Sequence, residues 1–324
     1  MKSTHRHLTI VLISLLVGIV LVDNPLTELY IAKLKADAVP VTSVEDSLYM
    51  EIVAKKAQYE KEPIDARIDP VWKKMPGLAG LRVDIDASYE KMKANGYFDE
   101  NDLVFEEIPP RVSLKDLPPA PIYRGLAEKP QVAFTVNVAW GNEYLSPLLS
   151  TLKKYHLHIT FFVEGRWAKQ NPDLVKIIAD GGHEIGNHSY SHPDMRTLNR
   201  EQIIKELTDT NVVIKATTEQ EVQWFAPPSG SYNEEVVKIA SELGMETIMW
   251  TVDTIDWQNP TPSTIIDRVT KQVHNGAIIL MHPTKSTVAA LEPMILKLQS
   301  VGYKIVPVGE LLDEHWPETI VKTN

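Results

Sequence analysis

The sequence contains no cysteine among its 324 residues. A disulfide framework, a thiolate metal site and a cysteine nucleophile are therefore excluded, and any metal ion must be bound by histidine, aspartate, glutamate or water. Positive charge is scarce as well: 33 Lys and Arg residues stand against 43 Asp and Glu residues, which gives a formal net charge of -10. This balance argues against nucleic acid as a partner, because a phosphate backbone selects basic surfaces. It also disfavours contact with an acidic wall polymer, except through a local basic patch.

Long apolar runs are lacking in most of the chain, and the N-terminus is the exception. Leu8 to Val22 is apolar apart from three residues, and the basic residues Lys2 and Arg6 precede it. A positive segment before an apolar core of this length is typical of a secretory signal, whereas a full membrane span needs about 20 apolar residues. A small-x-small sequence follows only at 36–38. The alternative is a buried helix at the start of a soluble protein.

We therefore predict that residues 1–38 are a signal peptide or a membrane anchor that contacts the cytoplasmic membrane. The rest of the chain is expected to be exported, either to the outer face of that membrane or to the wall. Residues 39–125 form an accessory or linker region in this prediction. It begins with a polar, charged helix from Ser43 to Lys61 and continues in short segments separated by proline and glycine.

From residue 126 to 315, short apolar strands alternate with amphipathic helices. This alternation is typical of an α/β fold, and we predict a distorted (β/α) barrel of about seven parallel strands. A nearly closed barrel is favoured over an open sheet because no dinucleotide-type glycine-rich turn is present. The expected strands are Val132–Val138, Ile159–Val163, Glu184–Asn187, Trp224–Ala226, Thr247–Val252, Ala277–Met281 and Lys304–Pro307. The expected helices are Glu143–Tyr155, Pro172–Asp180, Arg200–Thr217, Asn233–Leu243, Thr264–Gln272 and Val288–Ser300.

Two histidines, His188 and His192, directly follow one expected strand end. Two imidazoles at this spacing can bind one metal ion if the segment coils into a turn. Such a pair on its own is more often two surface or capping histidines, so the surrounding motifs decide between the two readings. Trp140, after another strand end, is either a core residue or the floor of a pocket.

Five motifs in order resemble those of the NodB-homology polysaccharide deacetylases, and the arrangement is most similar to the sporulation-associated branch of spore-forming bacteria. The motifs are Thr135-Val136-Asn137-Val138-Ala139 in the place of T-F-D-D-G, Asn187-His188-Ser189-x-x-His192-Pro193, Trp224-Phe225-Ala226-Pro227-Pro228-Ser229-Gly230 in the place of R-P-P-x-G, Asp253-Thr254-Ile255-Asp256-Trp257, and Leu280-Met281-His282.

The resemblance implies removal of N-acetyl groups from amino sugars in peptidoglycan or chitin-like glycans. In that family two histidines and one aspartate hold a divalent metal, which polarises the amide and acidifies bound water. A second aspartate is the base, an arginine steadies it, and a histidine backed by an aspartate protonates the leaving amine. The resemblance places His188 and His192 as metal ligands and His282 with Asp256 on the acid side. Trp257, Pro227 and Tyr232 are the implied substrate-binding residues.

Three positions depart from the family pattern. Asn137 stands where the base aspartate belongs, and an amide cannot accept a proton at neutral pH. Val138 replaces the third metal ligand, and Ala226 replaces the arginine. The replacements are consistent with one another, because a buried arginine that has lost its carboxylate partner would be an unpaired charge.

Two hypotheses from different classes remain open. In the first, the chain acts on or binds N-acetylated cell-wall glycan with weak or absent turnover, and its divalent metal (Zn²⁺ or similar) is weakly bound or absent. In the second, it is a fully active metal-dependent N-deacetylase with a rearranged metal site. Loss of a general base alone is expected to cost about 10²–10⁴-fold in rate, which favours the first.

Overall fold

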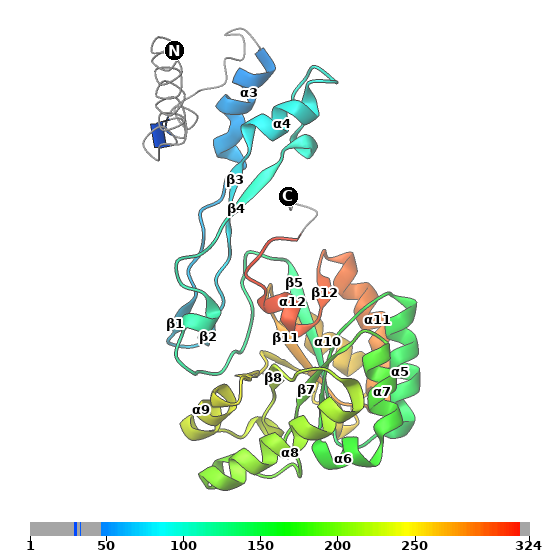
Figure 1. The fold of residues 1–324 in the computed structure, drawn as a ribbon. Helices are drawn as coiled ribbons and strands as arrows, with labels where there is room; N and C mark the ends of the chain where they lie inside the picture. Colours follow the sequence, from blue (N-terminus) through cyan, green and yellow to red (C-terminus); the bar gives the residue numbers. More distant parts are fainter. Residues whose placement is uncertain (1–28, 31–32, 34–46, 318–324) are drawn as a thin grey trace, which may run out of the picture. The chain divides into compact units, whose positions relative to one another are not determined.

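The computed structural model describes residues 29–30, 33 and 47–317 of the chain (Figure 1). The predicted export segment, Leu8 to Val22, and the small-x-small sequence at 36–38 lie outside the described residues. Within the described part, no helix is long and apolar enough to cross a membrane.

The chain divides into two compact units, of which the first includes residues 47–55 and 89–102 and the second 56–88 and 103–317. In the first unit, helix α3 (Ser47–Lys55) buries Leu48 and Ile52. The predicted helix from Ser43 to Lys61 ends earlier than expected: the short 3₁₀ helix η1 (Lys56–Gln58) follows α3, and Lys61 already pairs with Leu81. The described part of the predicted accessory region, 47–125, is therefore shared between the two units.

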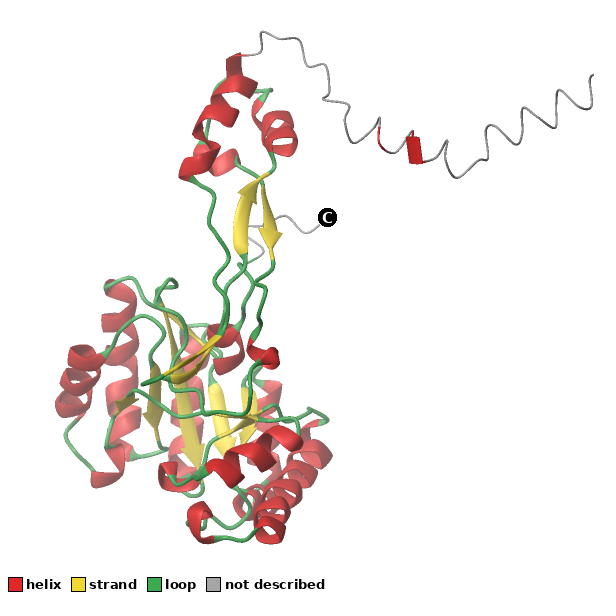
Figure 2. Cartoon of the chain, turned by 90° about the vertical axis from the view of Figure 1, so that its left-hand side faces the viewer, coloured by secondary structure: helices red, strands yellow, loops and turns green. Residues whose placement is uncertain are grey.

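The second unit is built around a parallel sheet that curls into a half-barrel (Figures 1 and 2). Seven strands follow the order β10-β11-β5-β6-β7-β8-β9, and β12 pairs with the beginning of β5. The predicted α/β barrel of about seven parallel strands is confirmed. The strands are β5 (Gln131–Val138), β6 (Thr160–Val163), β7 (Glu184–Asn187), β8 (Trp224–Phe225), β9 (Glu246–Thr247), β10 (Val252–Asp253), β11 (Ile278–Met281) and β12 (Lys304–Val306).

One predicted strand, Thr247 to Val252, is wrong as a single element. Two short strands form there instead: β9 pairs with β8, and β10 pairs with β11. Ile122 pairs with this part of the chain: its N–H donates to Thr247 O and its carbonyl accepts from Met249 N. Between β9 and β10, Ile248 N donates to Phe225 O of β8 and Thr251 N donates to Ile278 O of β11. Trp250, between these two residues, lines the pocket described below.

Helices cover the outer side of the sheet, and their ends match the sequence signals. Pro172 occupies the first turn of α7, and Asn199 forms a capping box with Gln202 at the start of α8. The expected helices are confirmed within a few residues, whereas α6 and α12 were not expected. The helices are α5 (Asn142–Lys154), α6 (Gly165–Gln170), α7 (Pro172–Asp180), α8 (Arg200–Thr218), α9 (Glu234–Glu242), α10 (Pro262–Gln272), α11 (Lys285–Ser300) and α12 (Val308–Leu312).

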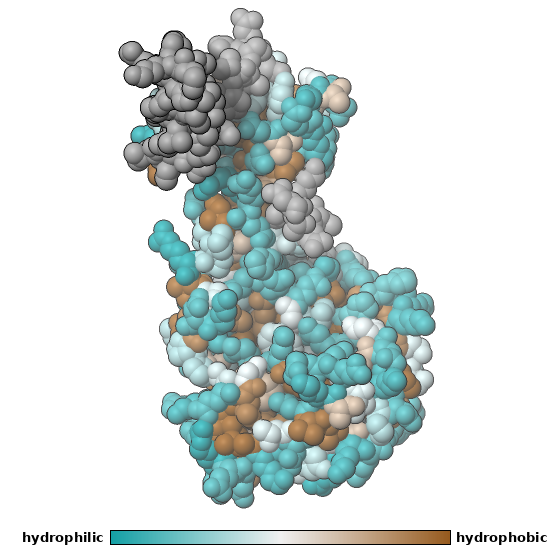
Figure 3. All heavy atoms as spheres, in the orientation of Figure 1, coloured by the Kyte–Doolittle hydropathy of each residue, from teal (hydrophilic) through white to brown (hydrophobic). Residues whose placement is uncertain are grey.

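The central strand β5 has two different faces, because successive side chains of a strand point to opposite sides. Its even-numbered residues from Val132 to Val138 belong to the large apolar cluster shared with the helices. Ala133, on the other face, belongs to a smaller cluster inside the curl, together with Phe162 and Ala226. On the face shown in Figure 3, hydrophilic side chains cover most of this unit, as expected when the apolar residues lie within.

The remaining segments of the second unit are fastened to the barrel. They form two antiparallel pairs, β1 (Arg67–Asp69) with β2 (Lys73–Met75) and β3 (Gly80–Val83) with β4 (Phe105–Ile108). The Glu314 carboxylate accepts from Gly77 N at 2.5 Å and from Leu114 N at 3.0 Å. Lys74, only 2% exposed, forms an ion pair with Glu246, which begins β9. These buried polar contacts hold the segments against the sheet.

Candidate functional site

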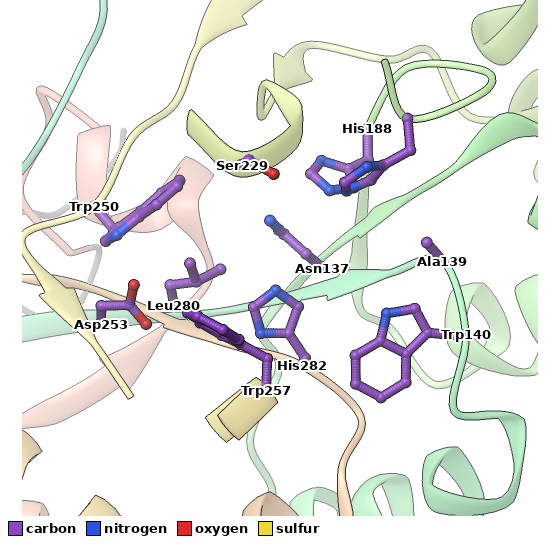
Figure 4. A pocket seen from close by; sticks show the side chains of 11 residues that line it. Asn137, Ala139, Trp140, His188, Ser229, Trp250, Asp253, Trp257, Leu280 and His282 are labelled. Atoms are coloured by element: carbon purple, nitrogen blue, oxygen red, sulfur yellow. The ribbon is translucent and has the colours of Figure 1, made fainter. Parts of the chain in front are cut away.

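A pocket of about 350 Å³ lies where the carboxyl ends of the strands meet, the edge at which barrels of this kind place their chemistry (Figure 4). The ends of β5, β10 and β11 and the loops after β5, β7, β8, β9, β10 and β11 supply its walls. It is lined by Asn137, Ala139, Trp140, His188, His192, Ser229, Trp250, Asp253, Trp257, Leu280 and His282.

The ring of His188 has a defined tautomer. Its Nδ1 lies 2.7 Å from the carbonyl oxygen of Ala226, and because a carbonyl can only accept, Nδ1 carries the proton and Nε2 keeps its lone pair. Burial, with a smaller contribution from His192, lowers the pKa of His188 from 6.5 to about 3. His188 is therefore neutral at physiological pH and presents an acceptor.

The two predicted metal-binding histidines are brought together. The rings of His188 and His192 lie 5.1 Å apart between centroids, with an angle of 73° between their planes. The turn that brings them together has a left-handed backbone at Ser189 and at His192 itself. Burial also lowers the pKa of His192. Both imidazoles are thus neutral, the form in which histidine binds a metal ion.

Asn137 adds an unsatisfied acceptor to the same pocket. It is 4% exposed, and its Oδ1 is buried with no hydrogen-bond partner among the described residues. Figure 4 shows its side chain directed into the space between His188 and His282. Buried polar atoms are rarely left unpaired, so a ligand, water or ion is the expected partner of this oxygen.

The two other replaced positions do not face the pocket. Val138 is fully buried in the outer cluster with Leu145 and its neighbours on α5. Ala226 is 3% exposed and contributes its carbonyl to His188, while its side chain belongs to the inner apolar cluster. The alternation of side chains along β5 could have shown that Val138 and Asn137 point to opposite sides.

Among the residues that the structure describes, no carboxylate fills the predicted place of a third metal ligand. Asp194, the acidic residue two positions after His192, is hydrogen-bonded to Ser231 and Arg196 instead. Across the described residues, no group of three or more His, Cys, Asp or Glu side chains is arranged to hold a metal ion. Two imidazoles and one amide oxygen fit a divalent ion only weakly, because they supply no negative charge.

The acid side of the predicted set is complete. His282 Nδ1 lies 2.8 Å from Asp256 Oδ1, and the backbone N–H of His282 donates to Oδ2 at 2.6 Å. Thr287 also donates to Oδ2 at 2.6 Å, and Asp256 is fully buried. The carboxylate thus fixes the tautomer and orientation of the imidazole, whose other edge faces the pocket.

Three of the seven tryptophans of the chain line this one pocket. Trp140 and Trp257 are 47% and 53% exposed, and the Trp140 ring lies nearly parallel to the His282 ring at 6.2 Å between centroids. Trp140 is therefore a pocket residue and not a core residue. Trp250 was missed, although it begins the stretch that carries Asp253 and Trp257. Exposed indole faces are suited to the apolar face of a sugar ring.

Two other predicted residues lie outside the pocket lining. Pro227 is buried beneath it, and Tyr232 bonds through its hydroxyl to that of Tyr123 at 2.7 Å. Ser229, which the sequence did not single out, does line the pocket and holds a left-handed backbone at φ 54°. Ile255, beside Asp256, does the same at φ 52°. Such positions cost about 1–3 kcal/mol each and concentrate at functional sites.

The fold and the pocket are those of a polysaccharide deacetylase-like barrel, and comparison with known proteins agrees. The family model for polysaccharide deacetylases matches residues 124–248. The uncharacterized protein YlxY of Bacillus subtilis is 50% identical over 294 residues, which cover 91% of this chain and 92% of YlxY. The peptidoglycan-N-acetylmuramic acid deacetylase PdaA of B. subtilis is 35% identical over 197 residues, covering 59% of this chain and 75% of PdaA. The chain belongs to the NodB-homology (CE4) polysaccharide deacetylase family.

Solved structures extend the likeness. The crystal structure of a CE4 family pseudoenzyme from Bacillus anthracis is 52% identical, with a TM-score of 0.80, and the match covers 85% of this chain and 98% of that one. A mutant of the same pseudoenzyme with restored enzymatic activity has a TM-score of 0.79 over 83% of this chain and 99% of its own.

Proposed function

We propose that this chain is a cell-wall glycan-binding protein that has kept the deacetylase pocket and has little or no deacetylase activity. The observation that carries the proposal is the content of the pocket. The pocket keeps His188, His192 and three tryptophans, together with His282 oriented by Asp256. It has the Asn137 amide in the place of the base, and no carboxylate among the described residues joins the two histidines as a third metal ligand. The similarity to a CE4 family pseudoenzyme supports the same conclusion. Membership in the sporulation-associated branch stays a prediction.

The lost groups act on the chemical step more than on binding. An amide at Asn137 cannot take a proton from an attacking water, so the rate falls by about 10²–10⁴-fold from this change alone. The walls that contact a sugar are instead the exposed rings of Trp140 and Trp257 and the apolar Leu280. Binding therefore survives changes that abolish turnover.

We expect Trp257→Ala and Trp140→Ala each to weaken the binding of an N-acetylated glycan by roughly tenfold, since stacking on an indole contributes on the order of 1 kcal/mol or more. Titration calorimetry with chitotetraose and with soluble peptidoglycan fragments measures this. Trp72→Ala, a tryptophan outside the pocket that packs against His274, is the matched control and should bind normally. Acetate release is followed in the same samples. Rapid release by the unaltered chain, abolished by His188→Ala, would support the fully active alternative.

A divalent metal such as Zn²⁺ is the cofactor that the family implies, and His188 and His192 would hold it here. When bound, the ion would polarise the amide carbonyl and acidify water. We expect weak binding, because two neutral imidazoles and one amide oxygen supply no charge to the ion. Calorimetry should show Zn²⁺ affinity that disappears in His188→Ala and persists in His183→Asn, a buried histidine outside the pocket. Tight binding that survives His188→Ala would place the ligands elsewhere.

Export to the outer face of the cytoplasmic membrane or to the wall is part of the same proposal, because wall glycan is found only there. Support comes from the basic, apolar N-terminus and from relatives named as peptidoglycan deacetylases. A fusion of residues 1–40 to a reporter that is active only after export tests it, and a reporter that stays inactive in the cytoplasm would contradict it.

A further inference from the structure

A second cavity, of about 270 Å³, adjoins the central pocket. The two cavities share His192 and Ser229 in their linings, so these two residues form the wall between them. Both wall residues have a left-handed backbone, at φ 57° and φ 54°. The second cavity is lined by His192, Pro193, Asp194, Arg196, Pro228, Ser229, Gly230 and Ser231.

Arg196 is the one cation among these lining residues. It belongs to the short 3₁₀ helix η4 (Met195–Thr197), and its Nε donates to the hydroxyl of Ser231, itself 8% exposed, at 3.0 Å. Its contacts with Asp194 are long, at 3.4 Å from Nε and 3.5 Å from Nη2. These distances are near the limit of a hydrogen bond.

The stronger partner of Asp194 is the Ser231 hydroxyl. That hydrogen bond and, after it, Arg196 lower the pKa of the Asp194 carboxyl, which is therefore ionised at neutral pH. Nη1 of Arg196 has no hydrogen-bond partner among the described residues. The guanidinium is thus oriented by Ser231 and keeps free N–H donors. Asp194 offsets part of its charge without enclosing it.

A guanidinium with free donors matches the geometry of a carboxylate better than that of any neutral sugar group. We propose that this second cavity binds the carboxylate of an acidic amino sugar, such as the lactyl group of muramic acid, when the neighbouring N-acetyl sugar occupies the central pocket. The inference rests on the proposed glycan-binding function and adds its specificity: a muramic-acid-containing glycan is preferred over a chitin-like one. In a chain of net charge -10, Arg196 is the cation that this cavity offers to an acidic glycan, although Asp194 offsets part of its charge.

Two substitutions at the cavity are expected to act in opposite directions. The measured quantity is the preference in affinity for a peptide-free tetrasaccharide of alternating N-acetylglucosamine and N-acetylmuramic acid over chitotetraose. Arg196→Gln removes the guanidinium, and we expect this preference to fall by about fivefold. Asp194→Asn keeps the side chain's hydrogen bonds to Ser231 but removes its negative charge, and we expect the same preference to rise. Both effects should shrink at high salt, because the contact is solvent-exposed. Arg166→Gln, an exposed arginine that lines neither cavity, is the control.

Titration calorimetry with both oligosaccharides separates the possible outcomes. Equal binding of the two glycans, or a preference that Arg196→Gln leaves unchanged, overturns the carboxylate site while the glycan-binding function stands. No binding of either glycan overturns the proposed function and this inference with it. A peptide-bearing tetrasaccharide identifies the source of the carboxylate, because its lactyl carboxyl is consumed in an amide bond. Weaker binding of this glycan supports the lactyl group as the ligand. Binding that is at least as tight and depends on Arg196 would assign the site to the stem peptide and contradict the lactyl assignment.

Discussion

Asn137→Asp, Val138→Asp and Ala226→Arg combined in one chain are expected to give measurable acetate release, with a gain on the order of 10²–10⁴-fold over the unaltered protein. The changes restore a base, a third ligand for the ion at His188 and His192, and a partner for the base. The existence of an active mutant of the CE4 family pseudoenzyme from B. anthracis supports the expectation that this fold can regain turnover.

Each change alone is expected to be inert or harmful. Ala226 lies in the inner apolar cluster with Phe162 and Ile248, so an arginine there without a carboxylate partner is a buried unpaired charge that costs several kcal/mol. An aspartate at 138 alone would place a carboxylate in the outer apolar cluster without a partner, which also destabilises the fold. Acetate release and the thermal midpoint of all single, double and triple variants measure the coupling.

The expected gain in acetate release depends on the direction in which the side chain at position 138 points. The Val138 side chain packs against α5 in the outer cluster, so an aspartate there points away from the histidines unless the end of β5 turns over. Ala139 follows it, where the family has glycine, and Gly141 is held against Pro283, since a Cβ at 141 would lie 2.2 Å from the Pro283 carbonyl oxygen. We expect Ala139→Gly, added to the triple variant, to raise turnover further, because glycine frees this turn. A triple variant that is already fully active and as stable as the original would show that Val138 can face the pocket without it.

The sequence was sufficient for the fold class and for most of the candidate site. Alternation of strands and helices gave the barrel, and the spacing of His188 and His192 placed both in one pocket. It was insufficient where the outcome depended on contacts between distant segments. The expected strand from Thr247 to Val252 divides instead, because β9 pairs with β8 and β10 pairs with β11, and Trp250 between them lines the pocket. No local sequence pattern in residues 247–252 predicts these two separate pairings.

Retention of the acid-side pair is weaker evidence for catalysis than the motif suggests. Asp256 accepts hydrogen bonds from the backbone and ring of His282 and from Thr287, and it joins the loop after β10 to the start of α11. Removal of such a fully buried carboxylate leaves several donors unpaired, at about 1–3 kcal/mol each. The fold thus has its own reason to keep Asp256 and, through it, the orientation of His282. Two of the three replaced positions, Val138 and Ala226, now contribute apolar side chains to the buried clusters instead.

The unaltered protein is expected to lose stability in mild acid through two buried histidines. Burial, and then the nearby His158, lowers the pKa of His183 from 6.5 to about 4, and burial lowers that of His188 to about 3. Between pH 6.5 and these pKa values, both imidazoles are neutral in the folded chain. In the unfolded chain, each imidazole binds a proton below about pH 6.5. The stability they contribute is therefore fully present above about pH 6.5. It is lost progressively as the pH falls from there toward the folded pKa values, about 4 for His183 and about 3 for His188. Each should cost roughly 2–3 kcal/mol between pH 7 and 4.5.

Urea unfolding at pH 7 and at pH 4.5, in the presence of a chelator so that no metal competes for His188, measures this loss. His183→Asn keeps an acceptor for the N–H of Ile159, which His183 Nδ1 now accepts at 3.3 Å, and removes the titrating group. The variant is less stable than the original at pH 7, because it loses the edge contact with Phe161, but its stability should depend less on pH by about the same 2–3 kcal/mol. His156→Asn, at an exposed histidine with a left-handed backbone that asparagine tolerates, is the control and should leave the pH dependence unchanged. If His183→Asn shows the same pH dependence as the original, the buried neutral imidazole at 183 is not the source of the acid sensitivity.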